Sequence, residues 1–202
     1  MLCRPNCGNT HGMKQIHKSA LTNRVCPVEL AGSLDFFLRR WLQNPSRILS
    51  PFVKAGMTVM DYGCGPGFFT VDMARLVGPA GRLIAVDLQA GMLAKLKHKI
   101  QGTEFASRIT LHRCSPDRIG LSERIDFALA FYVVHEIVDQ EAFFRQLAAL
   151  LAPDGRVLVV EPPLHVSRSD FRNTIQAAQN AGCIPEPGPR MLFSKSIVLR
   201  KS

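Results

Sequence analysis

From residue 57 onward, short apolar runs alternate with segments of helical periodicity, and this alternation limits the possible folds more than any other feature of the chain. Strands are predicted by apolar runs at 57–61, 82–86, 109–113, 125–134, 156–161, near Ile184 and at 196–200. Helices are predicted by apolar spacing at 46–52, 68–77, 91–100, 140–151 and 169–181. Strands separated by helices predict a parallel sheet covered on both faces, with right-handed crossovers. Ligands bind such sheets at the carboxyl ends of the strands.

The length and composition suit one compact domain. The chain has 202 residues, of which 47% are hydrophobic and 20% charged, as in globular proteins. No apolar run reaches the length of about 18 residues that a membrane-spanning helix needs. The segment 1–26 lacks the apolar stretch of a secretory signal, so a cytoplasmic location is expected.

An N-terminal extension, residues 1–45, precedes the predicted sheet domain at 46–202. Residues 1–26 show no periodicity, whereas apolar residues recur at helical spacing in Pro27–Leu42. This predicted helix either covers the ligand pocket as a lid or packs on the flank of the sheet.

The six cysteines form no dense framework and are expected to be reduced thiols. Cys3, Cys7 and Cys26, together with two nearby histidines, offer enough soft ligands for zinc or for a metalloid, but their spacing matches no familiar zinc pattern. No metal is therefore predicted.

Positive charge is concentrated toward the N-terminus. The formal net charge is +9, and residues 1–50 carry seven Lys and Arg residues against two acidic ones. Such an excess can attract an anionic substrate, nucleic acid or a lipid surface. A solvated basic surface is favoured instead, because no run of Lys and Arg is longer than two.

Three alternating glycines, Gly63, Gly65 and Gly67, follow the first predicted strand and precede a predicted helix. Glycines allow a sharp turn and a close approach of a ligand, and the helix N-terminus offers free N–H groups. The spacing differs from the dinucleotide fingerprint. Asp61, two residues before the first glycine, repels a pyrophosphate and suits a cationic ligand such as S-adenosylmethionine. A tight turn without a ligand is the alternative.

A second acidic residue, Asp87, ends the second predicted strand. A carboxylate at this place accepts hydrogen bonds from both hydroxyls of a ribose. Leu88 beside it would pack on an adenine face. The alternative is that Asp87 only caps the helix that follows.

With these landmarks the chain resembles class I S-adenosylmethionine-dependent methyltransferases, in the group of the ubiquinone/menaquinone-biosynthesis-type enzymes, over about residues 45–200. The resemblance rests on Val59–Gly67, Asp87, Ile125–His135 and Leu150–Leu158. The last segment matches the family's turn before strand five, with Asp154 in place of the first glycine. The resemblance implies a doubly wound, mostly parallel, Rossmann-like sheet of seven strands, in the order 3-2-1-4-5-7-6 with strand 7 antiparallel.

The resemblance also implies which residues contact the cofactor. The glycine turn holds its methionine part, the acid after strand two holds its ribose, and the loop after strand three approaches its adenine. The end of strand four lies beside the methionine part. The residues carried over are Asp61, Tyr62, Gly63, Cys64, Gly65, Gly67, Asp87, Leu88, Ser115, Pro116, Asp117, Phe131 and Tyr132.

Methyl transfer to a small molecule, leaving S-adenosyl-L-homocysteine, is the activity that the resemblance implies. It places His135 near the acceptor pocket, as a base or a hydrogen-bond donor that Glu136 could orient. Glu161, after strand five, faces the same rim. For His135 and Glu161 alike, a structural role is the alternative. The Asp/Asn-Pro-Pro-Tyr/Phe run of amino-group nucleic-acid methyltransferases is missing.

Two other functions stay open. The basic charge is compatible with an RNA or tRNA methyltransferase. A regulatory protein that binds S-adenosylmethionine without turnover would carry the same cofactor motifs.

Overall fold

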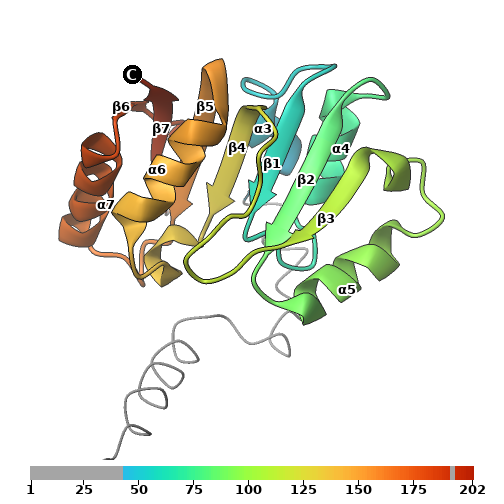
Figure 1. The fold of residues 1–202 in the computed structure, drawn as a ribbon, viewed down its shortest axis with the longest axis horizontal. Helices are drawn as coiled ribbons and strands as arrows, with labels where there is room; N and C mark the ends of the chain where they lie inside the picture. Colours follow the sequence, from blue (N-terminus) through green and yellow to red (C-terminus); the bar gives the residue numbers. More distant parts are fainter. Residues whose placement is uncertain (1–42, 192–193) are drawn as a thin grey trace, which may run out of the picture.

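Seven strands form one sheet in the order β3-β2-β1-β4-β5-β7-β6 (Figure 1). The computed structural model describes residues 43–191 and 194–202, so the predicted helix Pro27–Leu42 and the cysteines at 3, 7 and 26 lie outside the described residues. β7 runs antiparallel to both of its neighbours, and the other pairs are parallel, which confirms the predicted order and directions. The strands are β1 (Thr58–Tyr62), β2 (Arg82–Asp87), β3 (Ile109–Arg113), β4 (Ile125–Phe131), β5 (Leu151–Glu161), β6 (Cys183–Pro187) and β7 (Lys195–Lys201).

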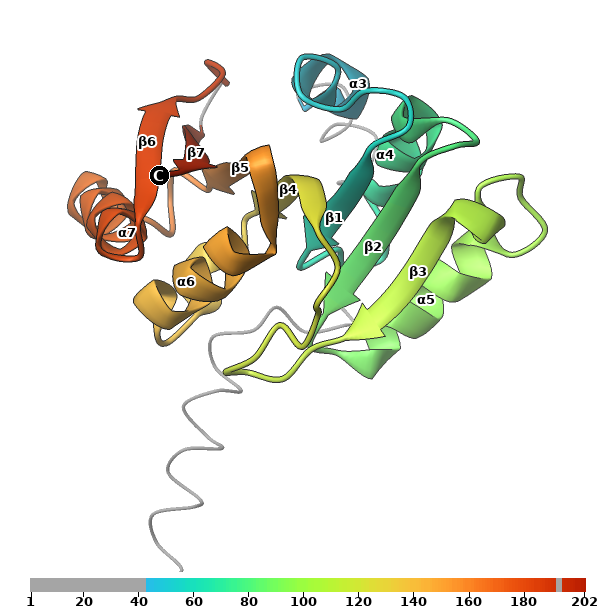
Figure 2. The ribbon, with the colours of Figure 1, turned by 45° about the horizontal axis from the view of Figure 1, so that its top comes forward.

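Helices cover both faces of this sheet (Figures 1 and 2). Met73 and Leu96 belong to the core on one face, and Phe144 and Leu147 to the core on the other. The first face carries α3 (Pro45–Leu49), α4 (Thr70–Val77) and α5 (Ala90–Ile100). The second carries α6 (Gln140–Leu150) and α7 (Arg168–Asn180). Two short 3-10 turns are η2 (Ala106–Arg108) and η3 (Val134–Glu136).

Side-chain caps fix where the helices on the second face begin. The Asp139 carboxylate accepts a hydrogen bond from the backbone N–H of Ala142 at the start of α6. Ser167 and Asp170 form a reciprocal capping box at the start of α7. Both helices begin near the carboxyl ends of the strands, so the caps also position the loops of that edge.

The end of β4 differs from the prediction. The apolar run predicts a strand to Val134, but β4 ends at Phe131. Tyr132 turns the chain with a φ of +60°, and a 3-10 turn follows. Val134 is still fully buried, so an apolar pattern alone does not reveal that the strand has ended.

The start of β5 also differs. A turn is predicted at 153–155 and a strand from Arg156, but β5 begins at Leu151. Leu151 pairs with Ile125 and Arg156 with Phe127, so the residues between them form a bulge inside the strand. The residues predicted as a turn before the strand therefore lie in a bulge within β5.

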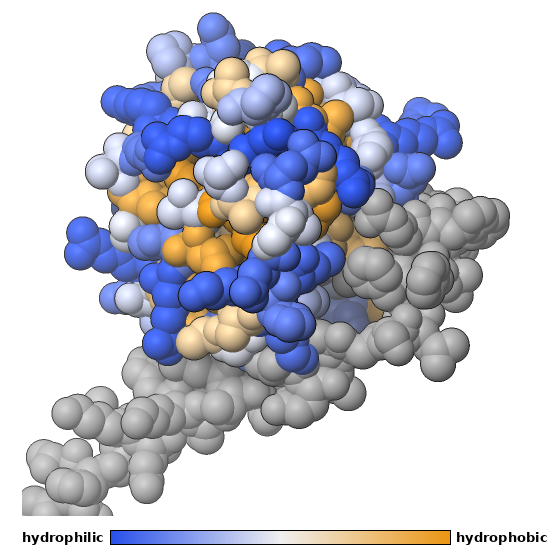
Figure 3. Space-filling view, turned by 90° about the vertical axis from the view of Figure 1, so that its right-hand side faces the viewer, coloured by the Kyte–Doolittle hydropathy of each residue, from blue (hydrophilic) through white to orange (hydrophobic). Residues whose placement is uncertain are grey.

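Figure 3 shows the side of the molecule that carries β3 and α5, where hydrophilic residues separate smaller hydrophobic areas. The exposed residues of α5 include Lys95, Lys97 and His98. Within the described ranges, no helix has the length and apolar character needed to cross a membrane.

Candidate functional site

The strand order reverses between β1 and β4, and the carboxyl ends of β1, β2 and β4 meet at this switch point. Open parallel sheets bind ligands at such a point. A cleft of about 150 Å³ lies there. It is lined by Tyr62, Gly63, Gly65, Asp87, Leu88, Gln89, Met92, Cys114, Ser115, Pro116, Tyr132, Val133, Glu136, Ile137 and Val138.

The glycine turn forms one wall of the cleft, and Gly63 and Gly65 are required there for different steric reasons. Gly63 has a φ of +71°, and a Cβ there would lie 2.6 Å from Cγ2 of Val133. Gly65 has a φ of +53°, and a Cβ there would meet no atom within 4 Å. Gly63 therefore permits close packing against the loop after β4, whereas Gly65 leaves backbone open to the cleft.

Asp87 joins the end of β2 to this turn. One carboxylate oxygen accepts the backbone N–H of Gly65 at 2.9 Å, and the other accepts the N–H of Gln89 at 2.8 Å. Burial raises the pKa of this carboxyl above its ordinary value. The predicted ribose carboxylate, Asp87, and the predicted glycine turn are thus joined directly by a hydrogen bond.

Asp61 lies behind the turn and does not line the cleft. Its carboxylate is buried and accepts a hydrogen bond of 2.7 Å from the Thr70 hydroxyl. Burial raises the pKa of Asp61 to about 6. The ammonium of Lys99, which donates to the Gly67 carbonyl at 2.6 Å, opposes that rise. The nearby positive charge of Lys99 therefore only partly offsets the cost of burying the Asp61 carboxylate behind the turn.

A second cavity, of about 300 Å³, adjoins the cleft between the loop after β3 and helix α6. The two share Tyr62, Pro116, Ile137 and Val138. Asp117 lines the second cavity, whereas Ser115 lines the cleft. The loop predicted to approach the adenine thus spans the junction of the two spaces.

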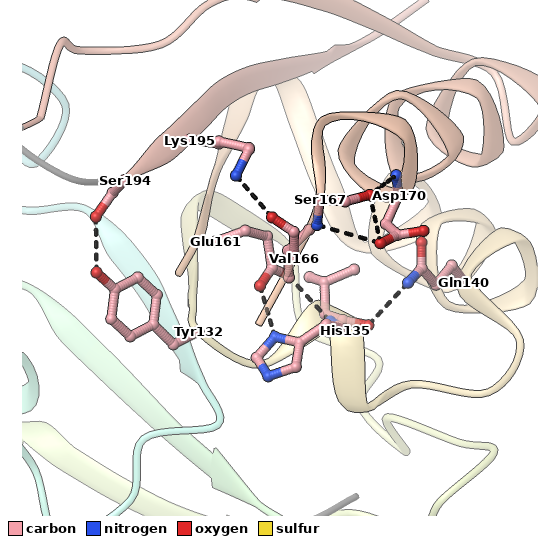
Figure 4. Close-up of polar contacts among 10 residues, drawn as sticks. Tyr132, His135, Gln140, Glu161, Val166, Ser167, Asp170, Ser194 and Lys195 are labelled. Atoms are coloured by element: carbon pink, nitrogen blue, oxygen red, sulfur yellow. Dashed lines mark hydrogen bonds and ion pairs between the residues drawn. The ribbon is translucent and has the colours of Figure 1, made fainter. Parts of the chain in front are cut away.

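His135, in η3, and Glu161, at the end of β5, form the pair drawn in Figure 4, and neither residue lines the cleft or the second cavity. The Glu161 side chain is fully buried, and the His135 side chain is 28% exposed. One carboxylate oxygen lies 2.6 Å from Nδ1 of His135, and the other accepts the His135 backbone N–H at 3.0 Å. The hydrogen bond to Glu161 raises the pKa of His135. Glu161 thus orients the ring, and Glu136, the orienting residue considered from the sequence, lines the cleft.

Tyr132 is the one non-glycine residue with a positive φ among the described residues. Its ring packs on Phe131, with centroids 4.4 Å apart. Its hydroxyl accepts a hydrogen bond of 2.6 Å from the Gln43 amide and lies 2.6 Å from the Ser194 hydroxyl. The residue lines the cleft and also contacts two segments of the rim.

Several predicted residues support the cleft from behind. Cys64 and Phe131 are buried in the core, and Phe131 packs between Phe69 and Tyr132. Neither they nor Gly67 lines the cleft. The predicted residues that line it are Tyr62, Gly63, Gly65, Asp87, Leu88, Ser115, Pro116 and Tyr132.

The cleft has further lining residues that the sequence analysis does not name for the cofactor site. Gln89 and Met92 lie two and five positions after Asp87, and this proximity along the chain is the signal that points to them. The remainder are Cys114, Val133, Ile137, Val138 and Glu136, of which only Glu136 is considered from the sequence, as a partner of His135. Among the residues that the structure describes, no cluster of three or more His, Cys, Asp and Glu side chains is placed to hold a metal ion.

Comparison with known families gives a match over most of the sheet domain. A family model described as "Methyltransferase domain" matches residues 53–187. The chain is 30% identical over 143 residues to a ubiquinone biosynthesis O-methyltransferase of Bradyrhizobium diazoefficiens, covering 70% of this chain and 53% of that protein. It is 26% identical over 162 residues to a ubiquinone/menaquinone biosynthesis C-methyltransferase of Pasteurella multocida, covering 75% and 60%. The chain thus spans little more than half the length of these relatives.

Solved structures share the fold. A SAM-dependent methyltransferase from Aquifex aeolicus superimposes with a TM-score of 0.74 at 20% identity, over 85% of this chain and 95% of that one.

Proposed function

The chain belongs to the methyltransferase-domain family of class I S-adenosylmethionine-dependent methyltransferases, and on this premise we propose that it transfers a methyl group to a small-molecule acceptor. The cofactor of this family is S-adenosylmethionine. When bound, it supplies a methyl group activated by a sulfonium. The observation that carries the proposal is the Asp87 carboxylate, which is held beside the open backbone of Gly65 at the switch point of the sheet.

Three features of the cleft and of the turn behind it support this cofactor. Asp87 accepts one backbone N–H on each oxygen, and a carboxylate oxygen has lone pairs for a further donor, such as a ribose hydroxyl. The open space over Gly65 admits a ligand close to the backbone. The negative charge of Asp61 behind the turn favours a cationic methionine part.

The adenine would lie where the cleft and the second cavity join. Pro116 lines both spaces and Leu88 lines the cleft, and both side chains offer apolar surface to a flat ring. Asp117 lines the second cavity, and its carboxylate is the proposed acceptor for the exocyclic amine of the base. The loop after β3 would therefore select the base, in the role carried over to Ser115, Pro116 and Asp117.

His135 is the proposed base for an acceptor that loses a proton on methylation. Glu161 occupies Nδ1, so Nε2, on the opposite side of the ring, is the nitrogen left to take a proton. The buried carboxylate stabilises the imidazolium that results. General-base help of this kind contributes roughly 100-fold or more to a rate. A hydroxyl acceptor needs this help, whereas an acceptor that is already a thiolate does not.

Apolar side chains on the rim favour an acceptor with an apolar portion. Two large hydrophobic residues within the described ranges are extensively exposed, Val138 at 64% and Leu164 at 92%. Val138 follows η3, which contains His135, and Leu164 follows β5, which ends at Glu161. The relatives named for quinone biosynthesis act in pathways of apolar compounds, which supports the same acceptor class.

Isothermal titration with S-adenosylmethionine tests the cofactor site. Asp87→Ala should weaken binding by about tenfold to 100-fold, because hydrogen bonds to a charged group contribute roughly 1.5–3 kcal/mol each. Asp154→Ala, an exposed carboxylate in the β5 bulge, is the matched control and should bind as the wild type does. Failure of the wild type to bind, or an unchanged Kd in Asp87→Ala, would refute the proposed site.

Formation of S-adenosylhomocysteine with a panel of phenols, quinols, thiols and amines tests the acceptor. Turnover of an apolar hydroxyl compound, reduced about 100-fold in His135→Gln at unchanged cofactor Kd, supports the proposal. Turnover only with RNA, together with a steep salt dependence of RNA binding, would establish the RNA alternative. Cofactor binding with no turnover of any acceptor would favour the regulatory alternative.

A further inference from the structure

The backbone of Tyr132 is unusual for its residue type. A bulky residue with a positive φ is a true outlier, and such outliers persist only where the surroundings hold them. Here the Tyr132 N–H donates to the Val160 carbonyl at 2.8 Å, which extends the β4–β5 ladder by one bond. The φ of +60° turns the side chain out of the strand direction. The ring thereby lines the cleft at the end where Gly63 and Val133 lie.

The hydroxyl at the tip of this ring connects two distant parts of the rim. Gln43 precedes α3, and Ser194 precedes β7, so the two contacts join residues separated by 89 and by 62 positions from Tyr132. A phenol hydroxyl has one donor and two acceptor sites. The Tyr132 hydroxyl can therefore accept a hydrogen bond from the Gln43 amide and donate one to the Ser194 hydroxyl at the same time. Figure 4 shows the Tyr132 hydroxyl pointing to Ser194, with the pair of His135 and Glu161 drawn in the same view.

We propose that Tyr132 is a positioning residue that links cofactor occupancy of the cleft to the placement of Gln43 and Ser194 on the rim. The inference rests on the proposed function, because the ring must meet the methionine end of S-adenosylmethionine. Asp87 at the far side of the cleft holds the ribose, so the methionine part extends toward Gly63 and Tyr132. A ligand that fixes the ring also fixes the hydroxyl and its two partners.

The fluorescence of Trp41 is the readout, because Trp41 is the one tryptophan of the chain and stands two positions before Gln43 in the sequence. S-adenosylmethionine is the probe, added to the full-length chain while Trp41 emission and the heat of binding are both recorded. In the wild type the cofactor should change the emission at saturation. Tyr132→Phe keeps the ring and removes the hydroxyl. It should reduce that change by at least about half, with a Kd within about tenfold, the effect of one or two hydrogen bonds.

Ser194→Ala provides the second variant, since it removes a partner and leaves Tyr132 intact. It should reduce the emission change in the same direction. Ser196→Ala, which loses a hydroxyl that donates to the Pro189 carbonyl at 2.6 Å, is the matched control and should respond as the wild type does.

The outcomes separate this inference from the proposed function. Absence of cofactor binding in the wild type would refute the cofactor site itself. Binding in the wild type without any emission change would overturn the positioning role alone. An undiminished emission change in Tyr132→Phe and Ser194→Ala would overturn it as well, as would an equal reduction in Ser196→Ala.

Discussion

The Glu161 carboxylate contacts His135 through both of its oxygens, one at the backbone N–H and one at Nδ1 of the ring. The first contact fixes where the chain leaves β4, and the second fixes how the imidazole is turned. One buried charge thus determines both the position and the orientation of the proposed base.

Glu161→Gln should lower the pKa of His135, because the hydrogen bond to the carboxylate is the largest cause of its raised value. Titration of the imidazole by NMR measures the change. Glu136→Gln is the control, since that charge is the smallest of the causes named for His135 and should have a smaller effect. A His135 pKa that is unaltered in Glu161→Gln would contradict the pairing.

The same pair predicts a pH dependence of stability. The pKa of His135 is raised above its ordinary 6.5, so the pair stabilises the fold fully below that value. The contribution is lost as the pH rises through the folded value. The difference in unfolding free energy between the wild type and His135→Gln should therefore shrink with rising pH, as measured by denaturant unfolding.

Asp61→Asn should stabilise the ligand-free protein near pH 7. The carboxyl has a pKa of about 6 when folded and 3.8 as its ordinary value, so stability falls as the pH rises between these values. We expect a gain of roughly 1–3 kcal/mol at pH 7 that vanishes near pH 4, measured by denaturant unfolding. The same variant should bind S-adenosylmethionine more weakly. A loss of stability at neutral pH would show that the charge is better compensated than its burial indicates.

Alanine at Gly63 should mainly lower stability, whereas alanine at Gly65 should mainly weaken cofactor binding. Gly63→Ala brings a Cβ against Val133 and should lower the unfolding free energy by about 1–3 kcal/mol, seen as a lower Tm. Gly65→Ala meets no atom, but its methyl enters the cleft and should weaken cofactor binding by about tenfold or more.

Gly102→Ala is the control for backbone strain in this comparison. Gly102 has a φ of +74° and open space around it, like Gly65, but it does not line the cleft. It should lose stability by about 1 kcal/mol and keep its cofactor affinity. Equal affinities in Gly65→Ala and Gly102→Ala would mean that the cofactor does not approach the turn.

Asp154 stands where the pattern of the resembled family has a glycine, and the structure explains why an aspartate is tolerated there. Its φ is not positive, and its side chain is exposed in the bulge of β5. Asp154→Gly should therefore lower the unfolding free energy by about 0.5–1 kcal/mol, because glycine loses more conformational freedom on folding. Thermal unfolding measures the change. A higher Tm in Asp154→Gly would show that the position favours glycine and would contradict the prediction.

Local patterns predicted the strands and helices well because burial follows the alternation of apolar residues. The offset of Asp87 from the glycines matches the acid that follows the second strand in nucleotide-binding sheets, so the sequence predicts it as a ligand of the ribose. Its hydrogen bond to Gly65 depends on the pairing of β1 with β2. The strand order depended on the family resemblance, because periodicity says nothing about which strands pair. The bulge of β5 was hidden for the same reason, since it depends on how Ile125 and Phe127 pair.

The contacts of the rim depend on register and on backbone conformation, which a single sequence does not carry. Phe131 lies opposite Val160, and this register brings Glu161 next to the chain that leaves β4. A shift of one residue would turn the carboxylate to the other face of the sheet. Tyrosine is a residue type that favours strands, so the sequence gives no indication that Tyr132 has a positive φ.

The parallel pairing of β1 with β4 sets when the site can form during folding. Val59 pairs with Phe127, so the wall that carries the glycines meets the wall that carries Tyr132 only after a long loop has closed. Contacts so distant along the chain form slowly, because the entropy of loop closure is lost before any contact compensates for it. A nascent chain that has emerged only as far as β3 would hold the glycine turn and Asp87 yet lack half of the cleft. The appearance of cofactor affinity during refolding would therefore mark completion of the central sheet.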